Sequence, residues 1–136
     1  MISLKQLNKE TIMGLDIYIE TQPKNDLNND TSRWQVGYFR KFNALVSWVE
    51  NNVGMVENCE LVELNREHLL KLKADLECLN EENCSEIMPT MEGFFFGSQK
   101  YDDFYWRDVD ELRELTEELI ENHDFDNNRL TFCAWW

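Results

Sequence analysis

The functional groups that stand out in this sequence are carboxylates, which occur in a row of acidic residues with helical spacing. Asp110, Glu114, Glu117 and Glu121 lie three or four positions apart. Because each residue advances about 100° around an α-helix, these four carboxylates would form a stripe about 60° wide. Carboxylates arranged in this way can pair with Arg and Lys side chains of a partner, as phosphates do. The pattern therefore predicts electrostatic binding to a basic surface.

Such a stripe is unfavourable for the helix itself, since like charges at i,i+4 spacing destabilise a helix by about 0.2–0.5 kcal/mol per pair. Arg107 and Arg113 are the basic residues within this stretch, and we expect little relief from them. The alternative interpretation is a solvated acidic face, which is what most charge runs are. The candidate partner-binding residues are Asp102, Asp103, Asp110, Glu111, Glu114, Glu117, Glu118 and Glu121.

The cysteines and histidines are the next candidates for chemistry. No two cysteines form a CxxC pair, so the sequence favours reduced and mostly buried thiols. The alternative is a zinc site, but the ligands of a four-coordinate zinc site usually lie closer together in sequence. We therefore predict no cofactor. The residues concerned are Cys59, Cys78, Cys84, Cys133, His68 and His123.

Catalytic motifs are absent from the sequence. It contains no phosphate-binding loop, dinucleotide fingerprint, HExxH or GxSxG. Asp102, Asp103 and Asp108 could bind a divalent cation, but acids at the start of a helix are also favoured by the helix dipole. Arg40-Lys41 is the one cluster of basic residues, so direct nucleic-acid binding is not expected. We expect a binding protein rather than an enzyme.

The distribution of charge supports a partner surface. The chain has 27 acidic and 13 basic residues, a formal net charge of -14. Residues 1–56 hold six acids and six bases, whereas residues 57–86 hold nine and three, and residues 102–126 hold eleven and two. Folding does not require such asymmetry, so it indicates a function for the acidic segments.

The same composition predicts a folded, soluble protein. Hydrophobic residues make up 43% of the chain and aromatic residues 12%, which is enough for a core. No apolar run approaches the roughly 20 residues of a membrane span, and no signal peptide is evident. A membrane partner is therefore not expected.

The elements that must position the acidic stripe follow from hydrophobic periodicity. Strands are expected at 15–20, 33–37, 59–64, 94–96 and 129–136, a loop at 21–32, and helices at 38–52, 65–79 and 102–123. This order predicts an α+β fold with about three helices on a small mixed or antiparallel sheet. We expect one domain at 13–136, preceded by an N-terminal extension at 1–12.

Three consecutive aromatic residues, Phe94–Phe96, stand between two glycines. Neighbouring strand residues face opposite sides, so the three rings cannot share one face. A buried central strand and an aromatic recognition loop both remain open.

Four segments resemble a family of small bacteriophage and prophage proteins. The segments are Met13–Tyr18, Gly37–Ala44, Pro89–Ser98 and Tyr101–Tyr105. Members of that family typically open with MGLDMYL, then carry GYWRKAN and later LPTxxGFFFGSxxYDexY. The resemblance spans residues 13 to about 122, and Phe39 stands where the family usually has Trp.

The resemblance implies a context but no catalytic mechanism. Small acidic phage proteins often inhibit host defence, and several anti-CRISPR proteins have this size and charge. We therefore expect a phage-encoded inhibitor, acting in the bacterial cytoplasm on a CRISPR effector nuclease or another basic nucleic-acid-binding protein. The alternatives are a small metal-binding phage protein or enzyme with a Cys/His site, and a structural role in the virion.

Overall fold

The computed structural model describes residues 14–91 and 100–136. The expected N-terminal extension and the Phe94–Phe96 segment therefore lie outside the described residues.

The described chain builds one antiparallel sheet with helices on one side. Four strands are hydrogen-bonded in the order β2-β1-β4-β3. Their bounds are Asp16–Pro23 for β1, Trp34–Arg40 for β2, Leu61–Leu64 for β3 and Asn128–Trp135 for β4. The predicted α+β class is confirmed.

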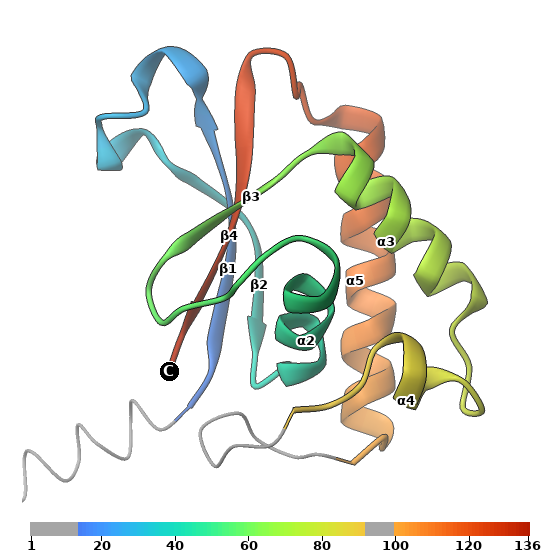
Figure 1. The fold of residues 1–136 in the computed structure, drawn as a ribbon. Coiled ribbons are helices and arrows are strands. Elements are labelled where there is room, and N and C mark those ends of the chain that lie inside the picture. The colour runs from blue at the N-terminus through green and yellow to red at the C-terminus, as the bar shows by residue number, and fades with distance from the viewer. Residues whose placement is uncertain (1–13, 92–99) are drawn as a thin grey trace, which may run out of the picture.

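The three long helices follow the strands in the order expected from the sequence, whereas the short helix at Cys84–Ile87 was not expected. Their bounds are Asn43–Asn52 for α2, Arg66–Cys78 for α3, Cys84–Ile87 for α4 and Asp103–Asn122 for α5. Two short 3-10 helices, η1 at Lys24–Asp26 and η2 at Asp30–Ser32, lie between β1 and β2. Figure 1 shows the helices gathered on one side of the sheet, with α5 as the longest.

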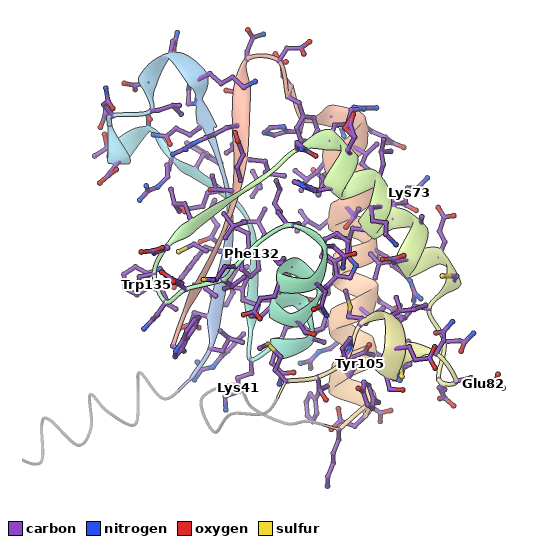
Figure 2. All side chains as sticks on the ribbon, in the orientation of Figure 1. Lys41, Lys73, Glu82, Tyr105, Phe132 and Trp135 are labelled. Carbon is purple, nitrogen blue, oxygen red and sulfur yellow. The ribbon has the colours of Figure 1, made fainter. Side chains whose placement is uncertain are left out.

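The sheet is apolar on the face that meets the helices. Ile19 and Phe132 are opposite one another on the central strands β1 and β4, and they are 4% and 0% exposed. Alternation places Tyr18 and Trp135 on the opposite face. Figure 2 shows Phe132 directed towards the helices and Trp135 away from them. The core therefore lies between the sheet and the helices, and the helices must present their apolar sides to it.

Two boundaries differ from the sequence prediction. Tyr38–Arg40 belongs to β2 rather than to a helix, because these residues pair with Asp16–Tyr18 of β1. Thr21–Pro23 extends β1 rather than opening a loop, because it pairs with Asn128–Leu130 of β4. In both places the inter-strand hydrogen bonds decide the conformation, and a local pattern cannot show them.

The helices α3 and α5 are close to their predicted positions. Asn65 caps α3 as expected, since its side chain accepts a hydrogen bond from His68 N at 2.8 Å. Leu69, Leu72 and Leu76 are buried along α3. The apolar spacing predicted both helices because each one buries a single side.

Arg113 joins α5 to the C-terminal end of α3. Its guanidinium donates to the carbonyl oxygens of Leu76, at 3.0 and 3.2 Å, and of Leu79, at 3.4 Å. It also pairs with Asp110 at 2.8 Å. Carbonyls in the last turn of a helix have no partner within the helix, so this side chain satisfies groups that would otherwise need water.

We predict that replacing Arg113 with Met lowers the free energy of unfolding by about 1–3 kcal/mol, because the part-buried carbonyls lose charge-assisted donors. Urea denaturation followed by circular dichroism measures this change. Arg113→Lys should lose less, since the ammonium can still reach one carbonyl. Equal stability of the wild-type and Met proteins would contradict this role.

Candidate protein-binding surface on helix α5

Helix α5 forms because local signals and burial agree. Asp102 is its N-cap, and one carboxylate oxygen accepts hydrogen bonds from Phe104 N at 3.1 Å and Tyr105 N at 3.2 Å. Such a cap contributes about 1 kcal/mol. The residues buried along the helix are Tyr105, Val109, Leu112, Thr116 and Leu119.

Burial of this side directs the acidic residues outwards. Seven of the eight candidate residues are exposed, and Asp102 is half-buried at the N-cap. We define the acidic face of α5 as the seven exposed residues: Asp103, Asp110, Glu111, Glu114, Glu117, Glu118 and Glu121. At 1.5 Å per residue, this face extends about 27 Å along the helix. The structure therefore brings seven of the predicted residues together on one rigid element and assigns Asp102 a capping role.

Few basic residues neutralise the acidic face. Asp110 is its one member with an ion pair among residues 14–91 and 100–136, and the partner is Arg113. Arg107 lies over the ring of Phe104, with its guanidinium carbon 5.0 Å from the ring centroid. We expected Arg107 and Arg113 to reduce the repulsion between the carboxylates only slightly, and the Asp110–Arg113 ion pair corrects this expectation at one position.

The neighbouring helix α3 shows the ordinary arrangement of surface charge. Lys71 pairs with Asp75 at 2.7 Å, and Lys73 pairs with Glu77 at 3.3 Å. Both pairs have the i,i+4 spacing that stabilises helices. Two adjacent helices of one protein thus differ, since α3 intersperses its charges and α5 accumulates one sign.

Asp108 lies on α5 but not on the acidic face. The pKa of its carboxyl is raised to about 6, mainly by burial; Arg107 opposes this shift, and Glu111 and Asp102 add to it. The folded protein therefore binds this proton more tightly than the unfolded chain. The stability cost of the ionised group is absent below its ordinary pKa of 3.8 and complete above about pH 6.

We predict that Asp108→Asn stabilises the protein at pH 7.5 by about 1 kcal/mol, a value reduced for solvent screening of a half-buried group. At pH 3.5 the variant should gain almost nothing, because Asp108 is then already neutral. Thermal unfolding at the two pH values measures the difference. The same gain at both pH values would contradict the assignment.

Of the four cysteines, Cys59 and Cys133 line one pocket together, whereas Cys78 and Cys84 do not line it. Cys59 and Cys78 are exposed, and Cys84 and Cys133 are buried, so only half follow the expectation of buried thiols. No group of three His, Cys, Asp or Glu residues within 14–91 and 100–136 is placed to hold a metal ion.

The two histidines have structural partners. His68 Nδ1 accepts a hydrogen bond from Asn65 N at 3.1 Å and completes the cap of α3. His123 Nε2 lies 2.7 Å from Thr21 Oγ1, and burial lowers the pKa of this histidine. These contacts hold helix ends in place, and spacing alone gave no signal of them.

Comparison with known proteins found no matching family model, no similar curated protein and no similar solved structure. Among the described residues, no helix combines the length and the apolar character needed to cross a membrane.

Proposed function

We propose that this protein binds a basic, nucleic-acid-binding protein through the acidic face of α5 and blocks that partner's access to nucleic acid. The observation that carries the proposal is the presence of seven exposed carboxylates on one helix. Only one of them, that of Asp110, forms an ion pair with a described residue. A stoichiometric inhibitor of this kind needs a charged surface and no catalytic group.

The spacing of the acidic face suits a basic groove. Seven carboxylates over about 27 Å give roughly one charge per 4 Å. One strand of DNA carries one charge per about 3.4 Å. Each Arg or Lys that would bind a phosphate in such a groove can pair with a carboxylate instead. The helix presents these groups on a rigid backbone, which limits the entropy lost on binding.

The contrast between the two helices favours this proposal over a solvated face. A surface that serves solubility alone gains from mixed charges, as on α3, where Lys71 and Lys73 pair with acids. On α5, the residues at i,i+4 spacing include Asp110 with Glu114, and Glu117 with Glu121. The helix accepts this repulsion although Lys at one member of each pair would remove it.

A host defence nuclease, and a CRISPR effector in particular, is the partner class that we propose. Its nucleic-acid channel is basic, and the resemblance to bacteriophage proteins supplies the biological setting. The binding would take place in the bacterial cytoplasm.

We predict that the triple variant Glu114→Lys, Glu118→Lys and Glu121→Lys weakens binding to such an effector by about 100-fold. The estimate sums about 1 kcal/mol for each reversed charge, since lost attraction and new repulsion act together. Surface plasmon resonance against a panel of purified effectors measures the affinity. The three positions leave the Asp110–Arg113 pair intact, and thermal unfolding checks that the variant folds.

The matched control is Glu81→Lys, Glu82→Lys and Glu86→Lys. These residues are exposed near α4, and their reversal changes the net charge by the same amount. The control should bind within about threefold of the wild type, apart from long-range attraction that salt screens. If both triple variants lose affinity equally, net charge rather than the acidic face drives binding.

A further inference from the structure

A pocket at one end of the molecule has the opposite charge from the rest. Its volume is about 550 Å³, which is within the range of sites for small molecules. It is formed where the first residues of α2 and α5 meet, and both helices start at this end in Figure 1. Figure 2 shows Lys41 and Tyr105 there. The basic residues that line the pocket are Arg40, Lys41, Lys100 and Arg107.

The concentration of basic residues is unusual for this protein. Residues 14–91 and 100–136 contain eleven Lys and Arg, and four of them line this one pocket. Two acids, Asp102 and Asp108, also line it, so basic residues outnumber acids among the described lining residues, in a chain of net charge -14. Lys41 and Arg107 are exposed and have no carboxylate within ion-pair distance among the described residues.

The start of α2 adds to the positive potential. This ten-residue helix has Phe42 at its N-cap, whose side chain accepts no hydrogen bond from the first turn. The N-terminus of a helix carries a partial positive charge that favours anions. Lys41 precedes it in the left-handed conformation, with φ of 61°. Asn43 is 2% exposed and accepts a hydrogen bond from Met91 N at 2.9 Å, which fixes this wall of the pocket.

The two acids of the pocket reduce this potential, but the basic residues outnumber them among the described lining residues. The carboxylate of Asp102 accepts hydrogen bonds from the first amides of α5 and is part of that helix cap. The carboxyl of Asp108 has a pKa raised to about 6, mainly by burial, and it keeps most of its negative charge at neutral pH. A ligand that enters the pocket thus meets basic side chains and the N-terminus of α2.

Aromatic residues also line the pocket. Phe42 and Tyr105 are buried, and the hydroxyl of Tyr105 donates to Met88 O at 2.8 Å. Phe104 is 64% exposed, and Arg107 lies over its ring. Exposed aromatic rings beside arginine are surfaces on which planar ligand rings stack.

We propose that this pocket binds a small phosphorylated molecule that carries a planar ring, with its phosphoryl group among the basic residues and its ring against Phe104. A nucleoside monophosphate is the simplest ligand of this class. The site is separate from the acidic face of α5 and does not depend on the proposed partner. Loss of one activity therefore leaves the other intact.

Isothermal titration calorimetry on the full chain tests the proposal with four probes: adenosine 5′-monophosphate, ribose 5-phosphate, inorganic phosphate and adenosine. We expect adenosine 5′-monophosphate to bind with a submillimolar dissociation constant, since about 1 mM corresponds to only one or two good contacts. Ribose 5-phosphate should bind more weakly, and adenosine more weakly still. Adenosine that binds as well as its monophosphate would overturn the assignment of a phosphate site.

Variants locate the site. Lys41→Gln should weaken the nucleotide about tenfold by removing one charge-assisted contact, whereas Lys24→Gln, at an exposed lysine outside the pocket, should not change it. Phe104→Ala should weaken the nucleotide about tenfold and leave ribose 5-phosphate unchanged. Lys41, Lys24 and Phe104 are all exposed, so each variant should still fold, and thermal unfolding verifies this.

Two further results would overturn the phosphate site. The first is the absence of binding by all four probes up to about 10 mM, a concentration that detects even very weak sites. The second is binding that neither Lys41→Gln nor Arg107→Gln weakens. Equal affinity for ribose 5-phosphate and the nucleotide would overturn the stacking of a ring on Phe104.

Discussion

Burial of one side of α5 against the sheet is the interaction on which the rest of this structure depends. Val109 and Leu112 are 0% and 3% exposed, and Phe132 on the central strand β4 is 0% exposed. Each such side chain contributes about 1.5–3 kcal/mol when removed from water. Repulsion between neighbouring carboxylates costs about 0.2–0.5 kcal/mol per pair. Burial therefore outweighs repulsion several-fold, and α5 can carry an unbalanced charge that an isolated helix could not.

That same burial fixes the direction of every charge on α5. Once the apolar side faces the sheet, the acidic face is held outwards along the helix, and Arg113 anchors the helix to the end of α3. The N-terminal end of α5 then lies beside that of α2, where basic residues line a pocket. One helix thus contributes to two surfaces: its outer side carries the acidic face, and its first turns help to line the pocket with basic residues of other segments. We infer two binding activities from these two surfaces.

The sequence predicted α5 and its outward carboxylates well because both follow from one local period. It also predicted α3, since the cap at Asn65 and the leucine spacing agree. The helix expected from Tyr38 begins only at Asn43, because Tyr38–Arg40 is held in the ladder with β1. Phe39 and Phe42 are both buried, and their spacing fits a helix as well as a strand followed by a helix. Such a boundary depends on hydrogen bonds to a distant segment.

The pocket could not be predicted for a related reason. Arg40 and Lys41 form a basic pair in the sequence, but Arg107 lies more than sixty positions further along the chain, on α5. Only the packing of α2 beside α5 brings these groups into one cavity. The raised pKa of Asp108 likewise arises from burial at this junction. Spacing along a helix reveals a surface made by one element, and it cannot reveal a site made by two.

The measurement that tests the central claim most directly is a competition titration. A basic effector nuclease is bound to fluorescently labelled nucleic acid, and the protein is added while anisotropy reports the bound fraction. If the acidic face occupies the nucleic-acid channel, the label is released with one protein per effector, and added salt weakens the competition. A complex in which the protein and the nucleic acid are bound to the effector together would contradict the account.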